Sequence, residues 1–211
     1  MSDDRKLNQS MIMNVLDWAY DKAVNGVPGL DSAQELAEDY LKGNGSMVDK
    51  VNSLIRWQNI KCATSGFLTN LGGLITLPVA IPVNISSVIY VQVRMIAAIA
   101  YMGGYDIRDD RVKSLVYVCL LGNAGKDLLK ELGVKIGNKL AQQAIQQITG
   151  QVIIKINQTV GFRLFTKFGE KGLINLGKGI PIVGALIGAT LDLLATDVIG
   201  NVARETFIET T

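Results

Sequence analysis

The feature that most constrains the fold of this chain is a stretch from Cys62 to Tyr105 in which Arg94 is the only charged residue. A transmembrane helix needs about 20 predominantly apolar residues, so the length of the stretch alone allows a membrane span. Hydroxyl and amide side chains are scattered through it, however, and they leave only short strongly apolar runs. The sequence therefore predicts helices that are buried on most sides, either in a protein core or in lipid.

Two prolines divide this stretch. Proline in a helix interior removes a backbone hydrogen bond and clashes with the preceding turn, so Pro78 and Pro82 predict a break. We therefore expect two helices, at about 46–71 and 83–102, that form a hydrophobic helical hairpin over about residues 62–105. Its arms suit a buried core as well as a re-entrant hairpin in a bilayer.

Helical spacing of apolar residues recurs in the rest of the chain, and alternating strand patterns are scarce. Ser32 and Glu35 form the pattern of a capping box at the start of a short helix. Asp106 is expected to cap another helix. We predict further helices at about 5–24, 32–41, 107–121 and 151–168, an apolar stripe over 128–148, and a last helix from Pro181 to about residue 200. The fold class is all-α, a compact multi-helix domain around the central hydrophobic hairpin, and residues 1–211 form a single domain.

Basic residues concentrate in one part of the chain. Residues 126–178 carry nine basic and three acidic side chains, whereas residues 1–55 carry five and nine. Within this basic amphipathic segment, Lys155, Arg163 and Lys167 fall within an arc of about 120° on a helix. They predict a positively charged face that meets an anionic membrane or an acidic partner, although the same lysines also suit the solvated face of an ordinary helix. Nucleic-acid binding is not expected, because no recognition motif with interleaved exposed aromatic residues is present.

The last apolar helix contains two glycines at a spacing of four, Gly184 and Gly188. Small residues at this spacing let two helix backbones approach closely. Only 13 uncharged residues, Gly179 to Leu191, surround them, which is too short for a free membrane span. We expect them to serve close helix packing in the core, or to contact a membrane or a partner, including a second copy of the chain in a homo-oligomer.

Several kinds of chemistry are excluded or disfavoured. The chain has no histidine, which removes the serine–histidine and cysteine–histidine nucleophiles and most zinc catalysis. Its two cysteines, Cys62 and Cys119, lie in apolar surroundings and are expected to be reduced thiols. No glycine-rich loop has the spacing of a phosphate cradle, so neither a cofactor nor a metal is predicted. The acidic cluster from Asp106 to Asp110 is compatible with an acid–base pair or a cation site, but it equally suits the start of a helix.

Arg94 stands alone in the apolar stretch, and two interpretations stay open. A charge within an apolar helix is costly and is usually paired or functional. Arg94 is therefore expected either to contact a membrane or partner, or to pair with Asp106 or Asp192 inside a protein core. The first residues, Met-Ser-Asp-Asp-Arg-Lys, are not those of a signal peptide, so we expect a cytoplasmic protein, peripheral to or partly embedded in the inner face of the cell membrane.

A family resemblance rests on several segments spread along the chain. They are Gly29 to Ala33, Leu54 to Gln58, Gly66-Phe67, Gly72-Gly73, Leu77-Pro78, Ile81-Pro82, Gln92 with Arg94, Gly104 to Asp106, Lys155 to Asn157, Val160 to Leu164, Thr166 to Gly172 and Pro181 to Gly184. In this order the sequence resembles the EcsC protein family of bacteria over most of its length. The resemblance implies a helical bacterial protein with a membrane connection, and it supplies no catalytic residue.

These observations favour a non-enzymatic, membrane-associated protein. It would act through the hydrophobic hairpin, with Pro78 and Pro82 at its bend, and through the basic face on an anionic membrane or a membrane protein. Two alternatives stay open. One is a membrane-perturbing effector that releases the hairpin from a soluble form, and the other is a hydrolase-like enzyme that uses a serine–lysine pair or the acidic cluster.

Overall fold

The fold is all-α, as predicted. The computed structural model describes residues 8–63, 83–134, 145–176 and 196–208. The helices are α1 (Gln9–Asn25), α2 (Ala33–Leu41), α3 (Met47–Ala63), α5 (Val83–Met102), α6 (Asp110–Cys119), α7 (Asn123–Glu131), α9 (Gly150–Leu176) and a C-terminal helical segment at 196–207. Across these ranges the only β-type pairing is an isolated bridge between Val27 and Leu30.

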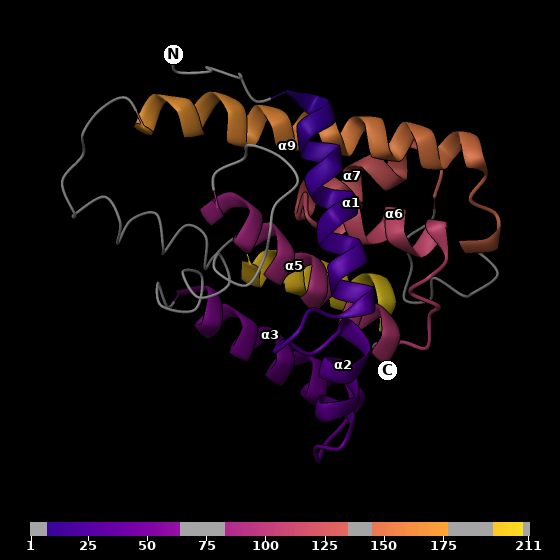
Figure 1. Cartoon of the computed structure of the whole chain (residues 1–211). Coiled ribbons are helices and arrows are strands. Elements are labelled where there is room, and N and C mark those ends of the chain that lie inside the picture. Colours follow the sequence, from indigo (N-terminus) through magenta and orange to yellow (C-terminus); the bar gives the residue numbers. More distant parts are fainter. Residues whose placement is uncertain (1–7, 64–82, 135–144, 177–195, 209–211) are drawn as a thin grey trace.

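Helix α5 lies at the centre of the molecule, and the other helices pack around it (Figure 1). It contacts α1, α2, α3 and α6, and the C-terminal segment lies beside it. Every side chain from Ser86 to Ala100 is buried, so the whole circumference of the helix is covered. The prediction of a helix buried on most sides is thereby confirmed for the second arm of the hairpin. The predicted first helix, about 46–71, is described as α3 up to Ala63, and its remaining residues, with Pro78 and Pro82, lie outside the described residues.

The bounds of α5 agree with the predicted 83–102. The helix ends at two glycines, of which Gly104 adopts a left-handed conformation with φ of 82°. Gly103 is needed for a different reason. A Cβ at this position would lie 2.2 Å from the backbone oxygen of Phe207, so only glycine lets the C-terminal segment pass this close. The end of α5 is thus fixed by both local geometry and tertiary packing.

The predicted starts of α2 and α3 are also confirmed. The backbone N–H of Ser32 donates to Glu35 Oε2 at 2.8 Å, and the backbone N–H of Glu35 donates to Ser32 Oγ at 3.2 Å. Ser46 and Asp49 make the same reciprocal pair at the start of α3. Each pair satisfies two N–H groups that the first turn of a helix leaves without partners.

The predicted cap of α6 was wrong. The helix begins at Asp110, and Asp109 is its cap, with Oδ1 accepting from the backbone N–H of Arg111 at 2.7 Å. Asp106 instead accepts from the backbone N–H of Arg108 at 2.8 Å and closes a turn three residues earlier. Two aspartates spaced by three both suit a cap, and local pattern alone does not distinguish them.

Other predicted boundaries need correction, including the end of α9, which continues to Leu176 rather than stopping near residue 168. Helix α7 ends at Glu131, because Gly133 turns the chain with φ of 72°, so the apolar stripe over 128–148 is not one uninterrupted helix. The C-terminal segment continues to residue 207 rather than stopping near residue 200. Its buried apolar side chains beyond that point, Val202, Ala203 and Phe207, join the core.

The C-terminal segment packs antiparallel against α3. Asn52 contacts Arg204 at one end of the pair, and Asn59 contacts Asp197 at the other. Between these contacts, a Cβ at Gly200 would lie 2.8 Å from two side-chain carbons of Ile55, which is itself 3 % exposed. The absence of a side chain at Gly200 therefore permits the close approach of the two helices.

We expect Gly200→Ala to destabilise the protein by about 1–3 kcal/mol, because the buried side chain of Ile55 must shift to make room for the new methyl group. Urea unfolding followed by circular dichroism measures this. Gly150→Ala is the matched control, since a Cβ there meets nothing within 4 Å, and its stability should be unchanged or slightly higher. Equal effects of the two substitutions would show that Gly200 is not a packing contact.

Candidate functional site

Arg94 is 2 % exposed and lies among side chains of α3 and α5. Its Nη1 donates to the backbone oxygen of Asp31 at 3.1 Å, and its Nη2 donates to Gln58 Oε1 at a long 3.5 Å. The guanidinium carbon lies 5.6 Å from the centre of the Tyr90 ring, within cation–π range. Within the described residues Arg94 forms no ion pair with Asp106, and Asp192 lies outside them.

Arg94 and the charge of Asp31 both act on Lys61 and Tyr90. Partial burial and the nearby charge of Arg94 lower the pKa of the Lys61 ammonium. Burial raises the pKa of the Tyr90 phenol. Neutral acceptors rather than carboxylates thus hold the guanidinium, which joins α5 to the turn before α2 and to α3. This geometry indicates that Arg94 holds α5, α3 and the turn before α2 in position relative to one another.

We expect Arg94→Lys to lower the free energy of unfolding by about 1–3 kcal/mol. An ammonium is a point charge that does not bridge the Asp31 and Gln58 oxygens as the guanidinium does, so a buried acceptor loses its partner. The midpoint of urea unfolding measures the change. Arg108→Lys in the exposed turn before α6 is the control and should stay within about 0.5 kcal/mol of the original chain. Unchanged stability of Arg94→Lys would contradict the bridging geometry.

The other predicted site residues lie in different places. Lys155 is exposed on α9, whereas Nη1 of Arg163 donates to the backbone oxygen of Ala124 at 2.9 Å at the start of α7. Lys167 belongs to the backbone of α9, but its side chain lies outside the described residues, as do Pro78, Pro82, Gly184 and Gly188. The structure therefore does not bring Arg94 and the basic residues of α9 into one site.

Two exposed apolar side chains mark the outer face of α9. Ile154 is 59 % exposed and Phe162 is 56 % exposed. At 100° per residue they share an arc of about 100° with three exposed polar residues. We call this set the outer face of α9, and its members are Gln151, Ile154, Lys155, Gln158 and Phe162. The opposite side of the helix buries Ile156, Val160 and Leu164 and packs on α1 and α6.

An open depression adjoins this face. It lies where α1 crosses α9, has a volume of about 570 Å³, and is lined mostly by apolar surface around Met13 and Ile154. Sequence reasoning missed this site, although a signal existed. Among the side chains of α9 that the structure describes, Ile154 and Phe162 are large, apolar and exposed, and their spacing of eight leaves them about 80° apart on one face of the helix.

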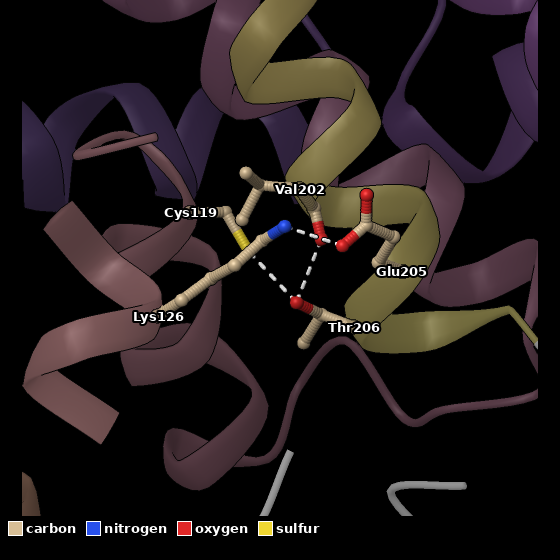
Figure 2. Close-up of polar contacts among 5 residues, drawn as sticks. All are labelled: Cys119, Lys126, Val202, Glu205 and Thr206. Carbon is tan, nitrogen blue, oxygen red and sulfur yellow. Dashed lines mark hydrogen bonds and ion pairs between the residues drawn. The ribbon is translucent and has the colours of Figure 1, made fainter. Parts of the chain in front are cut away.

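The polar cluster around Cys119 has no features of a nucleophilic centre. Figure 2 shows Cys119 facing Thr206, with an Sγ to Oγ1 distance of 3.8 Å, and Lys126 paired with Glu205. Thr206 Oγ1 donates in turn to the backbone oxygen of Val202 at 2.7 Å. Burial raises the pKa of the Cys119 thiol to about 12, so the reactive thiolate is absent at neutral pH. These contacts fasten the C-terminal segment to α6 and α7.

Two hypotheses from the sequence concern a cation site in the acidic cluster from Asp106 to Asp110 and a membrane span. Asp106 and Asp109 each accept a backbone N–H, and the described residues hold no group of three side chains suited to a metal ion. None of the described helices combines the length and the apolar character required to cross a membrane.

The geometry defines a class of protein, a helical domain wrapped around one fully buried helix, with an exposed amphipathic helix on its surface. A sequence model of the EcsC protein family matches residues 30–208, which is most of the chain. The protein therefore belongs to the EcsC family, as the sequence motifs indicate. No curated protein and no solved structure matches the chain.

Proposed function

We propose that this protein is a peripheral membrane protein that binds anionic bilayers through the outer face of α9. The observation that carries the proposal is the pairing of Ile154 and Phe162, both more than half exposed, on the same face as Lys155. A helix that presents apolar side chains and a lysine on one exposed face has the character of an interfacial helix. The excess of basic residues over 126–178 supports an anionic surface as the partner.

The side chains on the outer face of α9 determine the free energy of membrane binding in this proposal. Fully burying an isoleucine or phenylalanine stabilises by about 1.5–3 kcal/mol, so side chains that are already half buried contribute about 1 kcal/mol each. A lysine near an anionic surface adds about 1 kcal/mol. The sum, about 3 kcal/mol, is less than one lipid chain provides, so a second membrane contact is needed for stable attachment. In this proposal the charge-free segment between Ala63 and Val83 is that second contact.

Co-sedimentation with lipid vesicles tests the proposal. The protein should partition onto vesicles of phosphatidylcholine with phosphatidylserine more strongly than onto phosphatidylcholine alone. Phe162→Gln and Ile154→Gln should each lower the partition coefficient by roughly 5-fold, and Lys155→Glu should lower it only on the anionic vesicles.

Trp57→Gln is the matched control for these variants. Trp57 is 52 % exposed, similar to Phe162, but it lies on α3, away from α9 (Figure 1). Its loss should leave partitioning unchanged, and all variants should keep their helicity by circular dichroism. Equal partitioning onto neutral and anionic vesicles, or an effect of Trp57→Gln as large as that of Phe162→Gln, would reject the outer face of α9 as the binding surface.

A further inference from the structure

A polar cavity lies between α3 and the C-terminal segment, away from the outer face of α9. Its volume is about 310 Å³, at the lower end of the range of small-molecule sites. Apart from Ile55, the lining side chains are polar or charged. They are Asn52, Arg56, Asn59, Asp197, Asn201 and Arg204.

One end of this cavity has an unused hydrogen-bond acceptor. Asn59 is 9 % exposed, and its Nδ2 donates to Asp197 Oδ1 at 3.1 Å. Because an ionised carboxylate only accepts, the orientation of the Asn59 amide is fixed, and Oδ1 points elsewhere. Among the residues that the structure describes, Asn59 Oδ1 has no partner. Asp197 accepts a second bond from Asn201 Nδ2 at 3.1 Å, so acceptor oxygens gather at this end.

The other end has an unused donor. Arg204 Nη1 donates to Asn52 Oδ1, while Arg204 Nε is buried and finds no acceptor in the described part of the chain. Arg56, which is exposed, lines the cavity between the two ends and adds a second guanidinium. A buried polar group without a partner costs about 1–3 kcal/mol, so two such atoms on residues that line one cavity destabilise this part of the fold unless a ligand reaches them.

The two ends are separated by seven residues on each helix, which corresponds to about 10 Å at 1.5 Å per residue. Arg56 lies about 4.5 Å along α3 from the level of Asn59 by the same measure. From this arrangement we infer that the cavity binds a small dipolar molecule. Its hydrogen-bond-donating cationic end lies at Asn59 and Asp197, and its carboxylate or phosphate lies at Arg56 and Arg204.

Titration of the full chain with 6-aminohexanoate, followed by isothermal calorimetry and by backbone amide NMR, tests this inference. The molecule carries an ammonium and a carboxylate at opposite ends of a flexible chain. Hexanoate and hexylamine are the matched probes that each keep one charged end. Binding of 6-aminohexanoate should be saturable, at least 10-fold tighter than that of either single-charge probe, and should shift amide signals of residues 52–59 and 197–204.

Variants identify the cavity as the site. Arg204→Gln should weaken binding of 6-aminohexanoate and hexanoate by at least 10-fold, and Asn59→Leu should weaken binding of 6-aminohexanoate and hexylamine. Arg108→Gln, which removes a guanidinium far from the cavity, should change neither affinity. Thermal unfolding confirms that each variant is folded, and Arg56→Gln, at an exposed position, replaces Arg204→Gln if that chain fails to fold.

Each outcome of the binding experiments either supports or overturns the inferred ligand site. Equal affinity for 6-aminohexanoate and the single-charge probes, no saturable binding, or signal shifts outside the two helices would overturn the inference. Because the cavity and the outer face of α9 lie on different helices, vesicle partitioning should be unaffected by Arg204→Gln. A failure of the inferred ligand site can therefore be distinguished from a failure of the proposed membrane function.

Discussion

The structure depends on the complete burial of α5. A helix that is covered on all sides needs neighbours around its whole circumference, and α1, α2, α3 and α6, with the C-terminal segment, supply them. Two segments of backbone approach each other closely only where the side chains between them are small or absent. Gly103 therefore faces the backbone of Phe207, and Gly200 faces Ile55. The single charge that this helix carries, at Arg94, is accommodated because neutral oxygens of Asp31 and Gln58 receive its hydrogen bonds.

Much of the fold could be predicted because its signals are local. Proline before α5 and paired glycines after it define that helix, and the reciprocal side-chain bonds of Ser32 with Glu35 define the start of α2. The predicted helix boundaries were wrong where more than one residue suits the start or the end of a helix. Asp106 and Asp109 both suit a helix cap, and each accepts a backbone N–H two residues further on, so the local pattern does not show after which one the helix begins. Gly133 ends α7 because it adopts a positive φ, which a helical periodicity does not reveal.

The candidate sites were less predictable, for a physical reason. Periodicity shows which residues share a side of a helix, but not which side meets a neighbour. Lys155 and Arg163 fall on one broad arc of α9, yet Arg163 is bound to the backbone of α7 and Lys155 is exposed. The exposed pair Ile154 and Phe162 became visible only when the packed side of α9 was known. The cavity beside α3 has no sequence signal at all, since its residues come from segments more than 130 positions apart.

Apolar and polar contacts along this cavity differ in how completely they are satisfied. The close apolar contact of Gly200 with Ile55 brings the two helices together, while the polar contacts on either side leave Asn59 Oδ1 and Arg204 Nε unpaired in the described residues. Replacing buried polar groups by apolar groups of similar shape is often neutral or stabilising. Asn59 is buried, so stability alone does not account for its polar side chain beside this cavity. A ligand that donates to Asn59 and accepts from Arg204 would satisfy both orphan atoms at once, which is the physical basis for assigning the cavity a binding role.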